Sequence, residues 1–192
     1  MNTAKEKKII YFADGGHANT EATIACAVAC CREQSIPKIV VASSSGETAL
    51  KVRQAADPAC EVVAVTYGAG SRFTGEVEAF NANRPRLESA GIKIVRGIHA
   101  LSGTERTFEN KYAAKFIPLN LVSDSLRMFG QGMKVCVEVA IMAAEHGFIT
   151  PAENVVVIGG SGEGADTAVV LRPAYAAAMF DLRIRQILCK PL

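Results

Sequence analysis

Short runs of β-branched residues alternate along the chain with longer stretches of helical character. Several of the runs, such as "KIVVAS" and "NVVVIGG", are almost continuously apolar instead of alternating between apolar and polar positions. This pattern is typical of parallel strands that are buried on both faces of a sheet. The strands predicted in this way cover residues 8–13, 38–43, 61–67, 92–98 and 154–160.

The stretches between these strands predict helices, and the order of the two kinds of element predicts the fold class. The predicted helices cover residues 19–34, 45–56, 78–90, 119–129 and 133–146. Alternation of this kind predicts an α/β fold, a three-layer sandwich with a mostly parallel sheet and right-handed crossovers. Two further runs, residues 167–173 and 183–191, are predicted to be strands at an antiparallel edge.

Length, composition and charge indicate how many domains the chain forms and which classes of partner are not expected. With 192 residues of which 49% are hydrophobic, residues 1–192 are expected to form one domain with a full core. The net charge is +2 and the one dense basic run is "KEKK" at residues 5–8, so no nucleic-acid partner is expected. Charges interrupt the apolar segments before they reach membrane-spanning length, and the first residues lack the apolar core of a signal peptide. We therefore expect a cytoplasmic protein with no membrane partner.

The six cysteines are expected to be reduced thiols, because disulfides are rare in intracellular proteins. Cys26, Cys30 and Cys31 lie in one predicted helix, where we interpret them as small core residues. The three histidines and the scattered cysteines show no spacing that would bring zinc ligands together. No metal is expected.

Five loops follow the predicted strands, and all five are rich in glycine, serine and threonine. Their sequences are "DGGHANT", "SSSGET", "YGAGSRFTG", "HALSGTE" and "GGSGEGADT". Open parallel sheets bind ligands beyond the carboxyl ends of their strands. The shared composition of the five loops therefore indicates a polar ligand.

The loop "SSSGET" has two interpretations. Its glycine permits close backbone approach, the helix that follows offers unpaired N–H groups and the positive end of its dipole, and the hydroxyls of Ser43, Ser44, Ser45 and Thr48 add donors. These features favour a phosphate. In the alternative, Ser44 and Glu47 form a capping box, which satisfies the helix without any ligand.

The loop "GGSGEGADT" resembles a dinucleotide fingerprint but lacks its context. Gly160, Gly162 and Ala165 fit the spacing G-x-G-x-x-G/A, yet a strand and not a helix is predicted to follow. Two interpretations remain for this segment. It is either a flexible loop that folds over a ligand, with Asp166 and Thr167 at its far end, or a glycine-rich hairpin between two strands.

Titratable residues in two loops and one helix are further candidates. Glu138 lies in a helix that is apolar on almost all sides and needs a partner, which is either Lys134 one turn earlier or the hydroxyl groups of a ligand. His17 and His99 each either contact a ligand or are surface histidines without a role. Asn19 is suited to cap the first helix. No catalytic triad, paired carboxylates or P-loop occurs, so these patterns predict a binding cleft and no reaction.

Two long segments of the sequence resemble the C-terminal domain of pyruvate kinase. The first runs from "NTEATIACAVACC" through "VVASSSGETALKV" to "EVVAVTY", and the second from "MKVCVEVAIMAAEHG" to "GGSGEGADTAVVLRP". In many pyruvate kinases this domain binds the effector fructose 1,6-bisphosphate. By this resemblance, the residues that match its phosphate loop are Ser43, Ser44, Ser45, Gly46 and Thr48, and those that match its closing loop are Gly160, Ser161, Gly162 and Gly164.

The chain is most similar to a family of free-standing prokaryotic proteins with a fold like that of the pyruvate kinase C-terminal domain. Shared segments include "VVASSSGET", "LSGTER", "KVCVE" and "GGSGEGADTAVVLRPA". One departure is Gly15, where the family pattern has a proline before Gly16, and it loosens that loop. Since 192 residues cannot hold the catalytic barrel of pyruvate kinase, that activity is not expected.

Members of this family are similar to flavin mononucleotide (FMN) binders, and the resemblance implies FMN as the cofactor here. One phosphate suits "SSSGET", and a flat ring suits Tyr67 or the loop after it. The segments 68–88 and 99–112 have no good counterpart in pyruvate kinase and are expected to build the ring pocket. The predicted cofactor-binding residues are Asn19, Ser43, Ser44, Ser45, Gly46, Glu47, Thr48, Thr66, Tyr67, Gly68, Gly103, Thr104, Glu138, Gly159, Gly160, Ser161, Gly164, Ala165, Asp166 and Thr167.

Three functional hypotheses follow, and each expects a small phosphorylated ligand. The first is a binding protein for FMN or a similar phosphorylated metabolite. The second is a flavin-dependent oxidoreductase, in which His17, His99, Glu105 or Glu138 tunes the ring or moves protons. The third is a regulatory module that senses a sugar phosphate. Symmetric homo-oligomerisation is expected on general grounds alone.

Overall fold

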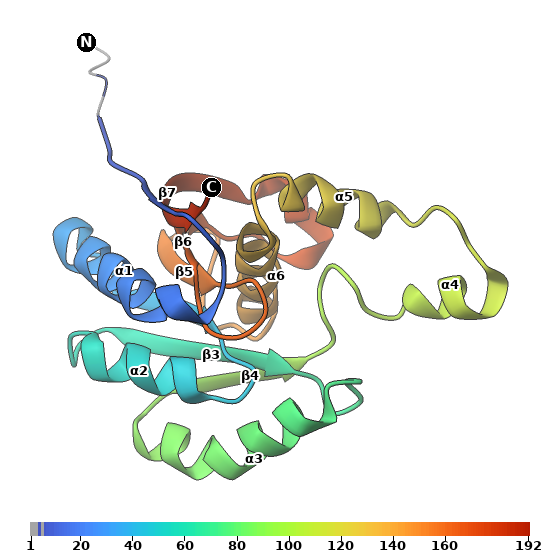
Figure 1. The fold of residues 1–192 in the computed structure, drawn as a ribbon, viewed down its shortest axis with the longest axis horizontal. Coiled ribbons are helices and arrows are strands. Elements are labelled where there is room, and N and C mark those ends of the chain that lie inside the picture. Colours follow the sequence, from blue (N-terminus) through green and yellow to red (C-terminus); the bar gives the residue numbers. More distant parts are fainter. Residues whose placement is uncertain (1–3, 5) are drawn as a thin grey trace.

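The computed structural model describes residue 4 and residues 6–192, which build a seven-stranded sheet with helices on both faces (Figure 1). Residues 1–3 and 5, part of the segment considered for a signal peptide and of the basic run "KEKK", lie outside the described residues. The strand order is β1-β7-β6-β5-β2-β3-β4. The strands are β1 (Ile10–Phe12), β2 (Lys38–Ala42), β3 (Glu61–Tyr67), β4 (Lys93–Gly97), β5 (Val155–Gly159), β6 (Thr167–Arg172) and β7 (Arg183–Pro191).

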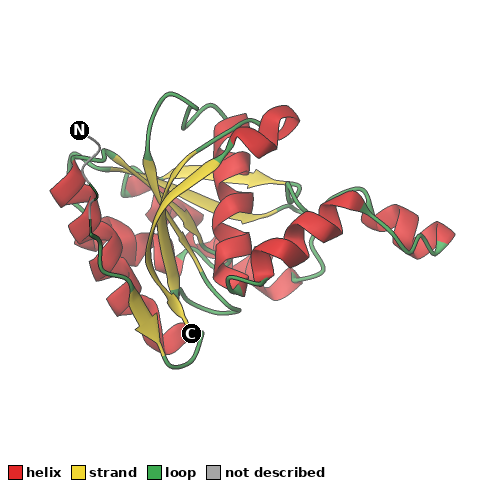
Figure 2. Cartoon of the chain, turned by 90° about the horizontal axis from the view of Figure 1, so that it is seen from above, coloured by secondary structure: helices red, strands yellow, loops and turns green. Residues whose placement is uncertain are grey.

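Helices cover both faces of this sheet, and the three layers are visible from above in Figure 2. One face packs against α1, α2 and α3, and the other packs against α6, with α5 outside α6. The predicted three-layer α/β sandwich is therefore confirmed. The helices are η1 (His17–Asn19), α1 (Thr20–Gln34), α2 (Glu47–Ala55), α3 (Thr74–Ser89), α4 (Arg106–Tyr112), α5 (Pro118–Arg127), α6 (Gln131–Glu145) and η2 (Ala176–Asp181).

The central strands are buried on both faces, which explains their unbroken apolar runs. Ile39 and Val41 of β2 pack into the layer of α1 and α2, while Val40 between them packs into the layer of α6. All three side chains are fully buried. Because side chains alternate across a strand, only a continuous apolar run can fill both layers.

The reversed strand lies inside the sheet, so the prediction of an antiparallel edge is wrong. β6 pairs antiparallel with both β5 and β7, whereas β7 pairs parallel with β1 and the edges are β1 and β4. The physical reason is the short connection of residues 160–166, which joins β5 to its neighbour as a hairpin without a crossover helix. The short amino-terminal strand then adds outside β7.

Helices α3 and α4 depart further from the sequence prediction than the other α-helices do. α3 begins at Thr74 instead of residue 78, and α4 falls in a segment for which no helix was predicted. We call residues 103–117 the α4 arm, since Figures 1 and 2 show α4 extending away from the sheet. Helix α4 has no buried residue, and Phe108 and Tyr112 are exposed on it. It therefore lacks the apolar stripe that reveals a helix in a sequence.

The prediction that Cys26, Cys30 and Cys31 are core residues is confirmed for Cys30 and Cys31, whereas Cys26 is half-buried, and all six cysteines are free thiols. Cys30, Cys31, Cys60 and Cys189 are buried in the layer of α1 and α2. No helix in the described part of the chain combines the length and the apolarity needed to cross a bilayer.

Candidate functional site

A cleft of about 330 Å³ opens at the carboxyl ends of β2 and β3, between these strands and α6. The loops after β2, β3, β4 and β5 contribute to its wall. The chain proceeds from β2 to β3 and β4 in one direction, while β5 lies on the other side of β2. Ligands of open α/β sheets bind where the strand order reverses in this way.

The loop between β2 and α2 forms one end of the cleft and is held by its own hydrogen bonds. The backbone N–H of Ala49 donates to the Ser43 hydroxyl at 3.3 Å, which fixes the first turn of α2. The Thr66 hydroxyl of β3 donates to the carbonyl of Ser44 at 3.3 Å. Ser43 and Thr66 therefore position the loop, and both residues also line the cleft.

The alternative interpretation of this loop, a capping box, is not what the structure contains. Glu47 turns away from the helix start, and its carboxylate accepts hydrogen bonds from Asn83 and Arg86 of α3, each at 2.9 Å. The Ser44 and Thr48 side chains line the cleft instead. Within the described residues, neither hydroxyl makes a hydrogen bond to protein, so both are free to bind a ligand.

The glycine-rich loop after β5 is tied to the start of the chain by Asp166. This side chain is fully buried and accepts hydrogen bonds from the N–H groups of Gly16 at 2.8 Å and Ser161 at 3.0 Å. It also accepts one from the Thr167 hydroxyl at 2.7 Å. Asp166 therefore holds the two loops together and does not line the cleft.

The far side of the same loop is fixed to α1. The N–H of Ala165 donates to the Thr20 hydroxyl at 3.0 Å, and the Thr23 hydroxyl donates to the carbonyl of Ala165 at 3.4 Å. A side chain at Gly164, which has φ of +74°, would overlap Thr20. The segment is thus a hairpin with anchored ends, while the glycines of its tip face the cleft.

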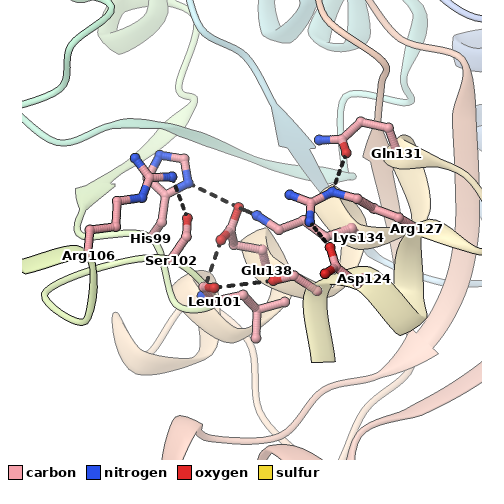
Figure 3. A network of polar contacts seen from close by, with 10 residues as sticks. His99, Leu101, Ser102, Arg106, Asp124, Arg127, Gln131, Lys134 and Glu138 are labelled. Carbon is pink, nitrogen blue, oxygen red and sulfur yellow. Dashed lines mark hydrogen bonds and ion pairs between the residues drawn. The ribbon is translucent and has the colours of Figure 1, made fainter. Parts of the chain in front are cut away.

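A buried polar network forms the wall of the cleft on α6 (Figure 3). Glu138 Oε2 lies 2.6 Å from Lys134 Nζ and 3.0 Å from His99 Nδ1. Glu138 Oε1 accepts a hydrogen bond from the N–H of Leu101 at 3.1 Å. The predicted ion pair of Lys134 with Glu138 is confirmed, and His99 joins it from the loop after β4.

The environment of Glu138 favours its ionised form. Burial by itself would raise the pKa of Glu138, but the hydrogen bond from His99 and the charge of Lys134 outweigh it and lower the pKa to about 2. At neutral pH this carboxylate is therefore a fixed negative charge beside two cationic or potentially cationic groups.

The low pKa of Glu138 predicts a loss of stability in acid. The folded pKa lies below the ordinary value of 4.5, so the contribution is complete above that value and disappears as the pH falls toward about 2. It is on the order of 3 kcal/mol. Urea unfolding of the wild type and of Glu138→Gln should show a stability difference that shrinks over this range. A difference that stays constant with pH would contradict the assignment.

Aromatic rings form a continuous run along the cleft. Tyr67, at the end of β3, stacks with Phe73 at a centroid distance of 5.0 Å and with His99 at 5.4 Å. Arg72 lies over the ring of Phe73 at 5.0 Å. Burial and the nearby carboxylate of Glu76 raise the pKa of Tyr67, so its hydroxyl stays protonated. The run offers flat apolar surface beside charged groups.

The predicted site residues divide into two groups. Those that line the cleft are Ser43, Ser44, Thr48, Thr66, Tyr67, Glu138, Gly160 and Gly164. The others, which support it or lie outside it, are Asn19, Ser45, Gly46, Glu47, Gly68, Gly103, Thr104, Gly159, Ser161, Ala165, Asp166 and Thr167. Asn19, for example, donates from its side chain to the carbonyl of Asp14 at 2.7 Å and makes no capping bond.

Of the four acid–base candidates, the structure brings two together. His99 and Glu138 meet in the cleft wall, whereas His17 lies exposed beside Gly164. Glu105 precedes α4 and does not line the cleft.

Several lining residues were missed by the sequence analysis, and four of them carry basic or amide side chains. Arg72 and Arg106 come from the two segments expected to build the ring pocket, while Arg127 and Gln131 come from the junction of α5 and α6. Arg127 is held by Asp124 at 2.6 Å and by Gln131 at 2.9 Å, as Figure 3 shows. Arg72 and Arg106 could have been found from the sequence, because each is a basic residue within a loop rich in glycine and serine.

Fold and cleft together define an α/β domain with a polar cleft at the carboxyl ends of its strands. Residues 21–171 match the model of the family described as "Pyruvate kinase, alpha/beta domain", so the chain belongs to that family. The solved structures that match include a pyruvate kinase from Cryptosporidium parvum, also solved in complex with ADP, at 16% identity and a TM-score of 0.39. The match covers 79% of this chain and 22% of that enzyme.

Proposed function

We propose that the cleft binds a phosphorylated small molecule, and that FMN is this ligand. The observation that supports it most is the joint presence of two unpaired hydroxyls, those of Ser44 and Thr48, and the aromatic run of Tyr67, Phe73 and His99 in one cleft. The hydroxyls suit a phosphate group and the aromatic run suits a flat ring, and FMN carries these two groups at opposite ends. The cleft volume of about 330 Å³ falls within the range of small-molecule sites.

The phosphate end of the ligand belongs at the start of α2. The N–H groups of Glu47 and Ala49 already donate to the hydroxyls of Ser45 and Ser43, but that of Thr48 makes no hydrogen bond within the described residues. This N–H group and the positive end of the helix dipole together attract an anion. Gly46, with φ of +91°, allows the chain to enter the helix at this angle. Ser44 and Thr48 then add hydroxyl donors on the side that faces the cleft.

The charge of the cleft also favours an anionic ligand. Glu138 is the one acidic side chain among the described residues that line it, and Lys134 neutralises this charge. The cationic lining residues are Arg72, Arg106, Arg127 and Lys134. A surplus of positive charge in a concave site raises the local concentration of anions.

FMN fits this set of residues, and its chemistry when bound would be electron transfer at the flavin ring. Tyr67, Phe73 and His99 would contact the ring, while Ser44 and Thr48 would hold the phosphate. Polar groups between them, including Thr66, would face the ribityl hydroxyls. What the chain contributes is orientation of the ligand and the electrostatic field around it.

Substitutions in the loop before α2 test this proposal. Ser44→Ala and Thr48→Ala should each raise the dissociation constant for FMN by about 10- to 100-fold, because a hydrogen bond to a charged group is lost. Ser45→Ala is the matched control: Ser45 is adjacent in the loop but does not line the cleft, so the change should be less than about twofold. Quenching of flavin fluorescence on titration measures all three.

The purified protein separates the proposal from its alternatives. The wild-type protein is expected to show the visible absorption bands of a bound flavin, either as purified or after FMN is added. A colourless protein that takes up no FMN would overturn the flavin proposal and favour a sugar phosphate as ligand. Oxidation of a reduced nicotinamide by the coloured protein would instead indicate a flavin-dependent oxidoreductase.

A further inference from the structure

His99 is held on one side of its ring by a carboxylate that is itself fully occupied. Glu138 receives hydrogen bonds from Lys134, from His99 and from the backbone N–H of Leu101. The side chains of Glu138 and Lys134 are 4% and 5% exposed, whereas that of His99 is 31% exposed. All three side chains line the cleft, and His99 is the most exposed of them.

The hydrogen bond to Glu138 determines which ring nitrogen of His99 is free. An ionised carboxylate can only accept, so Nδ1 of His99 must be the donor. In the neutral ring the proton then lies on Nδ1 and the lone pair on Nε2. Nε2 makes no hydrogen bond within the described part of the chain, and the ring lines the cleft in stacking contact with Tyr67.

We infer that His99 is the proton-exchanging group of the cleft: Nε2 takes a proton from solvent when a phosphorylated ligand places an oxygen or nitrogen acceptor against it. The inference rests on the proposed function, because it requires such a ligand in the cleft. For this step Glu138 and Lys134 are positioning residues, since they determine the orientation and the electrostatic environment of the His99 ring.

The proton and the charges balance in this step. His99 takes one proton from solvent at Nε2 and donates it in a hydrogen bond to the acceptor atom of the ligand, so no covalent bond of the ligand forms or breaks. The imidazolium is stabilised by Glu138 at 3.0 Å from Nδ1, and the ligand anion by the arginines of the cleft. The titratable and charged groups that face His99 or line the wall beside it are Tyr67, Arg72, Arg106, Lys134 and Glu138.

A purely structural role does not explain this arrangement. Lys134 already pairs with Glu138 at 2.6 Å, so the carboxylate does not need His99 for neutralisation. A histidine that served only packing would have no reason to keep one nitrogen free on the wall of a cleft. General acid–base groups, in contrast, combine an oriented ring with an accessible nitrogen.

Nitrogen-15 NMR of the ligand-free protein tests the first part of the inference. The long-range spectrum of the three histidines should show His99 with its proton on Nδ1, and Glu138→Gln should disturb this preference. His17, which is exposed and has no carboxylate partner among the residues that the structure describes, serves as the reference. A neutral His99 that carries its proton on Nε2 would overturn the inference whether or not FMN binds.

Calorimetric titration with FMN, in buffers of different ionisation heat at about pH 8, tests the second part. The wild type should take up a net fraction of a proton per FMN, up to one, and His99→Gln should abolish that uptake. His146→Gln, a histidine outside the cleft, should behave as the wild type. FMN binding with the same proton count in wild type and His99→Gln would overturn the inference and leave the proposed function standing. If FMN does not bind, the proposed function fails and the tautomer of His99 decides the inference alone.

Discussion

Replacing Glu138 with leucine is expected to lower the free energy of unfolding by about 3–5 kcal/mol, because a buried Lys134 loses its partner. The N–H of Leu101 and the ring of His99 lose their acceptor in the same step. Urea unfolding monitored by circular dichroism measures the change.

The double variant Lys134→Met/Glu138→Leu should recover most of this loss, since apolar replacements often substitute for a buried ion pair at little cost. The matched control is Glu88→Leu. Glu88 forms an ion pair with Arg84 at the same i,i+4 spacing, but both side chains are more than half exposed. Its loss should cost less than about 1 kcal/mol. A double variant as unstable as Glu138→Leu alone would show that the ion pair does not dominate the energetics of this wall.

Replacing Asp166 with alanine should cost about 3 kcal/mol or more, because the three donors that this buried side chain satisfies are left without an acceptor. The loops that carry Gly16 and Ser161 are then no longer joined. Hydrogen exchange should therefore accelerate at both loops, in addition to the loss of global stability in urea. No other substitution in the glycine-rich loop should accelerate hydrogen exchange in both loops as strongly.

Two control variants, Asp166→Asn and Asp181→Ala, separate the loss of the hydrogen bonds to Asp166 from the loss of an aspartate charge in general. The asparagine oxygen can replace Oδ2 of Asp166 and its amide can donate to Thr167, so about 1 kcal/mol is expected. Asp181 is exposed and makes no side-chain hydrogen bond within the described residues, so its removal should change stability by less than about 0.5 kcal/mol. Equal costs for Asp166→Ala and Asp166→Asn would contradict the role assigned to the three acceptor contacts.

The fold was predictable where burial leaves a mark on the sequence. The runs around Val40 and Val157 are apolar at every position because both faces of their strands are covered. The place of β6 was not predictable, because its apolar run is the same whichever neighbours it pairs with. Helix α4 was missed for the opposite reason: it buries nothing, so no periodic pattern marks it.

The site was predictable where strand ends determine it. Ser44 lies in the loop after β2, and Tyr67 is the last residue of β3. The rule that ligands bind beyond the carboxyl ends of strands therefore identifies both. Arg127 and Gln131 lie at a helix–helix junction that the rule does not cover. Asp166 was assigned to the ligand because it is polar and close in sequence to the glycines, whereas its buried position makes it a link between loops. Only the three-dimensional arrangement selects His99 with Glu138 among four equal candidates.

The α4 arm has an evolutionary consequence. Arg106, the first residue of helix α4, lines the cleft, yet no residue of this helix is buried against the sheet. Mutations, insertions or deletions there can alter the charge around a ligand without disturbing the packing of the sandwich. Selection can thus change what the cleft admits while the core sequence stays under separate constraint. Descendants of one ancestral domain could in this way acquire different ligands on an unchanged scaffold.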